Sequence, residues 1–162
     1  MENTIFDKVK IRKLNKNDSK LFIDLRLVFI KEHFDNMNES EIDFLKSDLS
    51  IYFNKHIENE DFIGMIGEYD EKIISVAYLT INEYPPSPNR KNGKGGTLLN
   101  VYTFPKYRKK GITKKLIENI IEEAKIIGVN LIELKASNDG YNLYKDIGFI
   151  DDNDYKNMKM KL

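Results

Sequence analysis

The second half of the chain places an amphipathic helical repeat between two apolar runs. Thr97 to Phe104 is apolar enough for a central strand, and Leu131 to Ala136 predicts another. Between them, apolar residues recur at spacings of three and four from about Gly111 to Ile127, which predicts a helix that Gly128 ends. A strand, a helix and a strand in succession form a βαβ unit, so the sequence predicts a mixed α/β fold.

The first part of the chain predicts a strand followed by two helices. Val9 to Leu14 alternates apolar and basic residues, as a half-buried strand does. Residues 17–19, Asn-Asp-Ser, offer capping side chains for a first helix, and Ser40 is the predicted cap of a second. Both helices are expected to turn an apolar face inward.

A hairpin and an irregular connection are expected next. Phe62 to Tyr69 and Lys72 to Glu83 read as two strands joined tightly at Asp70-Glu71. The stretch from Tyr84 to Gly96 is rich in Pro and Gly, so it predicts an exposed connection. It lacks the spacing of a nucleotide-binding glycine loop.

Two short elements are expected at the end of the chain. Gly140 to Ile147 predicts a short helix, and Met158, Met160 and Leu162 alternate along one face of a closing strand. The predicted element order is therefore β-α-α-β-β-β-α-β-α-β.

Length and composition limit the class of protein. The 162 residues suit a single domain spanning residues 1–162. No apolar run approaches the roughly 20 residues that cross a bilayer, and the first residues lack a secretory pattern, so we expect a cytoplasmic protein with no membrane partner. The chain has no cysteine, and its two histidines lie far apart, so we expect no metal site.

Charge is balanced overall but unevenly distributed. The chain has 26 basic and 26 acidic residues, yet Pro85 to Lys115 holds nine basic residues and no acidic one. This asymmetry favours a local site for a polyanion, although a solvated lysine-rich face explains it equally well. Glu32 to Glu71 holds twelve acidic residues, which would attract a cationic acceptor or form a solvated helix face.

The segment from Asn100 to Thr113 joins a strand to a helix start through a basic turn. The first amides of a helix have no intrahelical acceptor, so they point outward and bind phosphate oxygens. Gly111 removes the side chain that would block a ligand's approach, and Thr113 adds a hydroxyl. The segment therefore suits a pyrophosphate, although a basic helix entrance without a ligand remains an alternative.

Two motifs carry a resemblance to a known family. Arg108-Lys109-Lys110-Gly111-Ile112-Thr113 resembles motif A of the GNAT superfamily of acyl-CoA-dependent N-acetyltransferases, which reads Arg/Gln-x-x-Gly-x-Gly/Ala. Residues 143–149, Leu-Tyr-Lys-Asp-Ile-Gly-Phe, resemble the superfamily's Leu-Tyr-x-x-x-Gly-Phe signature. The likeness spans about residues 9–162. It implies a GNAT-like fold with a mixed, mostly antiparallel central sheet flanked by helices, and transfer of an acetyl group from acetyl-CoA to a primary amine.

The resemblance also implies roles for individual residues. Backbone groups of one strand would hold the pantetheine arm, the basic turn would hold the pyrophosphate, and a polar pair would lie near the coenzyme. Tyr144 would face the thioester sulfur as the general acid. The implied acetyl-CoA-binding residues are Val101, Tyr102 and Thr103 on the strand, Arg108, Lys109, Lys110, Gly111, Ile112 and Thr113 in the turn, and Ser137 and Asn138.

Several alternatives stay open at this stage. Leu99 stands where relatives place a carboxylate, so Glu32 or Glu83 acting through water is a candidate base. The amide of Val101 or Tyr102 is a candidate donor to the carbonyl oxygen. A catalytically silent acyl-CoA sensor of the same fold is the alternative function. We expect no nucleic-acid partner, because there is only one short basic patch, and an exposed closing strand would allow a homodimer.

Overall fold

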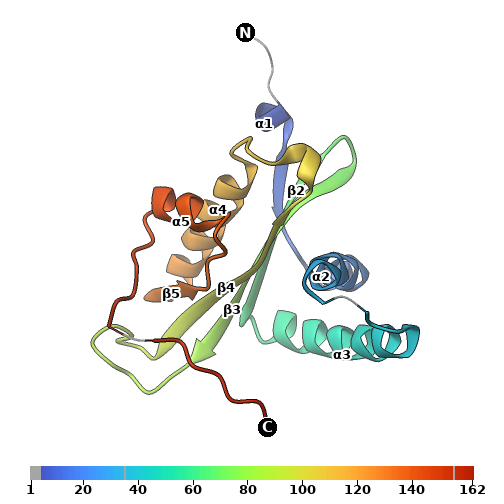
Figure 1. The fold of residues 1–162 in the computed structure, drawn as a ribbon. Helices are drawn as coiled ribbons and strands as arrows, with labels where there is room; N and C mark the ends of the chain where they lie inside the picture. Colours follow the sequence, from blue (N-terminus) through green and yellow to red (C-terminus); the bar gives the residue numbers. More distant parts are fainter. Residues whose placement is uncertain (1–4, 35, 155) are drawn as a thin grey trace.

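One five-stranded mixed sheet organises the computed structural model, which describes residues 5–34, 36–154 and 156–162 (Figure 1). Its strands stand in chain order, and β1 to β4 are antiparallel while β5 runs parallel to β4. The predicted mixed and mostly antiparallel sheet is therefore confirmed. The strands are β1 (Lys10–Lys13), β2 (Phe62–Tyr69), β3 (Lys72–Glu83), β4 (Lys94–Thr103) and β5 (Leu131–Leu134).

Helices cover both faces of this sheet (Figure 1). On one face, the apolar stripe of α4 packs on the strands with α5 beside it, and on the other face α2 and α3 enclose a second, aromatic-rich cluster. Within the described part of the chain, no helix is long and apolar enough to cross a membrane. The helices are α1 (Ile5–Lys8), α2 (Ser19–His33), α3 (Glu39–Glu58), α4 (Ile112–Ile126) and α5 (Tyr141–Ile147), with 3-10 turns η1 (Lys16–Asp18) and η2 (Pro105–Tyr107).

The predicted hairpin is confirmed at both strands and at the turn. Strands β2 and β3 have the predicted bounds, and Asp70 and Glu71 connect them. Both turn residues have positive φ angles, of 50° and 58°, as the two central residues of a tight hairpin turn require. Their short polar or flexible side chains face solvent, where this conformation is tolerated.

Helix caps differ from the prediction in a way that the hydrogen bonds explain. Asn38, not Ser40, caps α3, through a reciprocal capping box with Glu41. Asp18 precedes α2 but makes no side-chain cap there, because its carboxylate accepts both guanidinium nitrogens of Arg12 instead. The carboxylate also accepts the Asn15 amide, so partners from β1 and the turn before α2 occupy the capping group.

The irregular connection is shorter than expected. Gly95 and Gly96 belong to β4, which begins at Lys94, and Gly96 packs so closely on β3 that an added Cβ would lie 2.9 Å from Leu79. Glycine serves here for close packing, which composition alone does not distinguish from loop freedom. Strand β5 ends at Leu134, two residues before the prediction.

The predicted closing strand does not form. Met158, Met160 and Leu162 are 91%, 84% and 115% exposed, and the described residues after Phe149 contain no strand. Three apolar side chains alternating with lysines bury too little surface to offset the entropy of ordering the segment. The predicted order is therefore wrong at its last element, and the homodimer that this strand was expected to allow remains untested.

Candidate active site

Strand β4 runs beyond its parallel neighbour and leaves an open edge. The pairing of β4 with β5 extends only from Gly95 to Leu98, whereas β4 continues to Thr103. The register between β3 and β4 then shifts between Leu99 and Tyr102, and Asn100, which lies between them, has a φ angle of 51°. A β-bulge of this kind bends the strand, so β4 turns away from β5 where their pairing stops.

The backbone direction of β4 decides which groups face that edge. The amide of Phe104 donates to the carbonyl oxygen of Ile74 on β3 at 3.0 Å. Residues two apart in an antiparallel strand turn their backbone groups the same way, so those of Tyr102 also face β3. The backbone groups of Val101 and Thr103 therefore face the open edge.

A basic turn and an uncapped helix start follow this strand. Gly111 is the N-cap of α4 with a φ angle of 76°, and no side chain caps the helix. The first intrahelical bond runs from the Lys115 amide to the Gly111 carbonyl, so the amides before Lys115 have no acceptor within the helix. Arg108, Lys109 and Lys110 are exposed beside them. The turn therefore presents both full charges and backbone donors to an anion.

Three hydroxyl groups tie the end of β4 to the start of α4. Thr103 Oγ1 lies 2.6 Å from Ser75 Oγ and 2.7 Å from Thr113 Oγ1, and Arg108 Nε donates to the Thr103 carbonyl at 2.7 Å. These bonds bring Thr103, Arg108 and Thr113 together as the sequence predicted. The Thr113 hydroxyl already has a partner, which fixes the helix on the strand.

The remaining predicted residues come from α5 and from the loop between β5 and α5. Ser137 is exposed, and its Oγ accepts the Gly140 amide at 3.2 Å, while Asn138 is exposed in the same loop. Tyr144 is half-buried against the same core cluster as Val101, so α5 and β4 bring these two residues to one side of the sheet. Burial raises the pKa of Tyr144 above its ordinary value, which keeps the hydroxyl protonated at neutral pH.

The Gly-Phe pair that follows Tyr144 has a structural explanation. Gly148 ends α5 with a φ angle of 115°, a conformation that only glycine adopts readily. Phe149 then meets the Tyr144 ring edge-on, with 5.9 Å between ring centroids. The signature therefore fixes the orientation of Tyr144 at the end of a short helix.

A polar group on the α2 side of the bulge joins two predicted residues, Tyr102 and Glu32, to a pair that the sequence did not single out, Arg26 and Asn100. The Tyr102 hydroxyl donates to Glu32 at 2.7 Å, and Arg26 donates to the Asn100 side-chain oxygen at 2.9 Å. The Arg108 guanidinium lies 5.5 Å from the Tyr102 ring centroid. No motif or periodicity marks Arg26, because its contact spans 74 residues of sequence.

The two candidate bases lie in different places. Glu32 accepts the Tyr102 hydroxyl beside the bulge. Glu83 pairs in register with Lys94, six residues from Asn100 and therefore about 20 Å along the strand. The structure therefore places Glu32 beside the bulge on the α2 side of the sheet and Glu83 toward the other end of β3 and β4.

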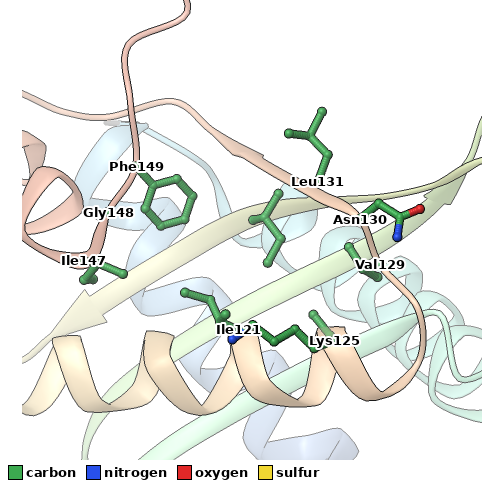
Figure 2. A pocket seen from close by; sticks show the side chains of 10 residues that line it. Ile121, Lys125, Val129, Asn130, Leu131, Ile147, Gly148 and Phe149 are labelled. Carbon is green, nitrogen blue, oxygen red and sulfur yellow. The ribbon is translucent and has the colours of Figure 1, made fainter. Parts of the chain in front are cut away.

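A separate cavity of about 260 Å³ lies between the second half of α4, β5 and the end of α5 (Figure 2). Ile147 and Phe149 face Val129 and Leu131 across it, and Lys125 lies at its side. Its lining includes none of the predicted site residues. Within the described residues, no group of three or more His, Cys, Asp or Glu side chains is arranged to hold a metal ion.

Comparisons with known proteins agree with this geometry. The model of the Acetyltransferase (GNAT) family matches residues 27–149. The crystal structure of a predicted acetyltransferase with acetyl-CoA from Clostridium acetobutylicum is 27% identical, with a TM-score of 0.80, and the match covers 93% of this chain and 96% of that one. No curated protein matches the chain.

More distant structures share the fold alone. A GCN5-related N-acetyltransferase from Ralstonia eutropha is 20% identical, with a TM-score of 0.75, over 93% of this chain and 98% of that one. An aminoglycoside acetyltransferase from an uncultured soil metagenomic sample, in complex with sisomicin, is 17% identical, with a TM-score of 0.75, over 98% and 99%.

Proposed function

This chain belongs to the GNAT family of acetyltransferases and uses acetyl-CoA as its acyl donor, and on that premise we propose that it acetylates the primary amine of a small molecule or peptide by direct attack, with Tyr144 as general acid. The observation that carries the proposal is the open edge of β4 leading to the uncapped start of α4. The edge offers backbone groups to an extended amide chain, and the helix start offers donors to a diphosphate.

The residues of the turn fit the anionic part of acetyl-CoA. Amides of Gly111, Ile112 and Thr113 would hold the pyrophosphate, with Arg108, Lys109 and Lys110 adding positive charge. Gly111 suits this role because an added Cβ would lie 3.3 Å from Phe6 on one side and would narrow the approach to the amides. Ile112 would contribute only its amide, since its side chain is 2% exposed in the core.

The strand edge and the β5 side fit the rest of the coenzyme. Val101 and Thr103 turn their backbone groups to the open edge, so they would pair with the pantetheine arm as a neighbouring strand does. Tyr102 would shape the site through its side chain, which faces α2. Ser137 and Asn138 would border the arm from the loop before α5, where both are exposed.

The chemistry needs a proton acceptor and a proton donor on this chain. When bound, acetyl-CoA supplies a thioester carbon that the amine nitrogen attacks as the carbon–sulfur bond breaks. Tyr144 would donate a hydrogen bond to the departing sulfur. Full proton transfer is uphill, because tyrosine has a reference pKa of about 10 and a thiol about 8.5. The hydrogen bond therefore supplies most of the stabilisation while the carbon–sulfur bond breaks, and Tyr144 would then pass its proton to the sulfur and regain one from water.

Glu32 is the base that we propose. An alkylammonium with a reference pKa of about 10.4 carries no free electron pair at neutral pH, so it must lose a proton before it attacks. The Tyr102 hydroxyl orients the Glu32 carboxylate at the bulge, and this carboxylate would accept the proton directly or through water.

Substitution of Tyr144 tests the proposal, with acceptors found by screening amines for release of free CoA. We expect Tyr144→Phe to lower turnover about 100-fold while the affinity for acetyl-CoA stays unchanged. Tyr141→Phe is the matched control, because Tyr141 lies on the same helix but donates to Asp151 on the surface. Unchanged turnover in Tyr144→Phe would remove this residue from the mechanism. Binding of acetyl-CoA without transfer to any amine would favour the silent sensor instead.

A further inference from the structure

The arginines of this chain fall into two groups by their partners. The chain has four, and Arg12 pairs with Asp18 and Glu68 while Arg90 pairs with Glu133. Among the described residues, no carboxylate lies within salt-bridge distance of Arg26 or Arg108. Arg108 lies in the turn that suits a pyrophosphate, so the proposed ligand would neutralise its charge. Arg26 has no such assignment.

Arg26 is half-buried, where an unpaired charge is unfavourable. It lies on α2 and directs one guanidinium nitrogen to Asn100, while its guanidinium carbon lies 5.6 Å from the Phe29 ring centroid. Burial lowers the pKa of Arg26 from its ordinary value, yet an arginine stays charged at neutral pH. A protein retains such a charge at low exposure when an anion or a polar group compensates it.

Asn100 holds this arginine at the bend of β4. The side chain is 3% exposed, and its oxygen accepts from Arg26. Its buried amide nitrogen has no hydrogen-bond partner among the described residues. Buried polar groups are nearly always paired. Behind the guanidinium, Asn100 offers one acceptor, its side-chain oxygen, and one unpaired donor, its side-chain nitrogen. Asn100 therefore acts as a positioning residue for Arg26.

A carboxylate of the same helix lies a short way from Arg26, against the next part of β4. Tyr102 follows Asn100 by two residues, a rise of about 7 Å, and it donates to Glu32, which lies on the same helix as Arg26. The α2 side of the bulge thus presents one cation and one anion at separate points. The other face of the sheet is filled by the core cluster under α4.

We infer that the acceptor is an amine that also carries an oxyanion, a carboxylate or a phosphate, and that Arg26 binds this oxyanion while the amine lies beside Glu32. The inference rests on the proposed function and deepens it, because it names the chemical class of the acceptor. A guanidinium suits both oxyanions, since its donors match their paired oxygens.

Matched acceptor pairs test the inference. β-Alanine is compared with β-alaninamide, and phosphoethanolamine with ethanolamine, as ratios of kcat/KM in the wild type and in three variants. Because each ratio is compared between proteins, the different pKa values of the amines cancel. Arg26→Gln removes the charge, Arg26→Lys retains it, and Lys20→Gln removes an exposed charge from the same helix as the control.

We expect the wild type to prefer the anionic member of at least one pair, and the pair that shows this preference identifies carboxylate or phosphate. Arg26→Gln should reduce the preference by about 10-fold to 100-fold, the loss of one or two hydrogen bonds to a charged group. Arg26→Lys should retain part of it, and Lys20→Gln should retain all of it. Calorimetry with acetyl-CoA shows in each variant that the donor site is folded.

Two results would overturn the inference. One is equal use of both members of each pair by the wild type. The other is an anionic preference that survives in Arg26→Gln, or in Arg26→Lys should the first variant fail to bind acetyl-CoA. Either result leaves acetyl transfer to an amine standing, because that part of the proposed function fails when no amine releases CoA.

Discussion

Replacement of Gly111 by alanine separates the two roles of this residue, in folding and in binding. An alanine at a φ angle of 76° costs about 1–2 kcal/mol, and its Cβ would lie 3.3 Å from Phe6, a contact that the ring must relieve by a small shift. For a domain of this length, that loss lowers the melting temperature by about 2–8 °C. The same methyl group would hold a diphosphate away from the first amides of α4.

We expect Gly111→Ala to lower the affinity for acetyl-CoA by more than its effect on folding stability would cause. A charge-assisted hydrogen bond at the helix start is worth about 1.5–3 kcal/mol, so the loss of one should raise the dissociation constant for acetyl-CoA about 10-fold to 100-fold. Isothermal titration calorimetry measures this constant, and thermal unfolding without ligand measures the cost in stability.

Gly128 provides the matched control at the other end of the same helix. Its φ angle is 81°, and an added Cβ would lie 3.1 Å from the side-chain nitrogen Nδ2 of Asn92. Gly128→Ala therefore carries a similar backbone strain and a similar side-chain contact. We expect both variants to melt earlier and only Gly111→Ala to bind acetyl-CoA weakly. Equal affinities in the two variants would refute the reasoning, because the turn would then not hold the ligand.

Three further predictions follow from the described contacts. Glu32→Gln should lower kcat about 100-fold without changing the affinity for acetyl-CoA, measured by CoA release and calorimetry. Replacement of both Lys109 and Lys110 by Gln should weaken acetyl-CoA binding at low salt, and the difference from wild type should shrink in titrations at high salt. Arg12→Met should destabilise the fold by about 1–2 kcal/mol at pH 7, and in urea melts this difference should narrow below about pH 4.

The sign of that pH dependence follows from Asp18. Burial alone would raise the pKa of its carboxyl, but hydrogen bonds from Arg12 and the Asn15 amide lower it below the ordinary value. A carboxyl with a lowered pKa in the folded state contributes stability above its unfolded pKa, and this contribution is lost as the pH falls through the lowered value. Protonation of Asp18 removes its part of the stability difference between Arg12 and methionine and leaves the pair of Arg12 with Glu68, so a difference that widens on acidification would contradict the assignment.

The sequence predicts the donor side of the site because its residues are contiguous. Val101 to Thr113 is one strand, one turn and one helix start, and the chemistry of each part follows from local geometry. The pair of Arg26 and Asn100 has no local signal, because α2 meets β4 only through tertiary packing. Local patterns therefore predict where acetyl-CoA binds but not what accepts its acetyl group.

The acidic stretch from Glu32 to Glu71 shows the same limit of prediction from local patterns. Its charges favour a cationic acceptor or a solvated surface, and the structure places five of the acidic residues on α3, all at exposed positions such as Asp43 and Asp48. Glu32 alone among the residues of this stretch that the structure describes is hydrogen-bonded at the bulge, where Arg26 supplies the opposite charge. The net charge of a long segment therefore indicates less about the acceptor than do Arg26 and Glu32, two side chains that the fold brings to the same bulge.

A single irregular residue links the two halves of the site. The bulge at Asn100 turns β4 away from β5, which opens the edge that suits the pantetheine arm. The same bulge sets Asn100 and Tyr102 toward α2, where they contact Arg26 and Glu32. Without the extra residue, the side chains of β4 beyond the bulge would shift to the opposite face of the sheet. Donor edge and acceptor surface therefore depend on one local departure from regular β structure.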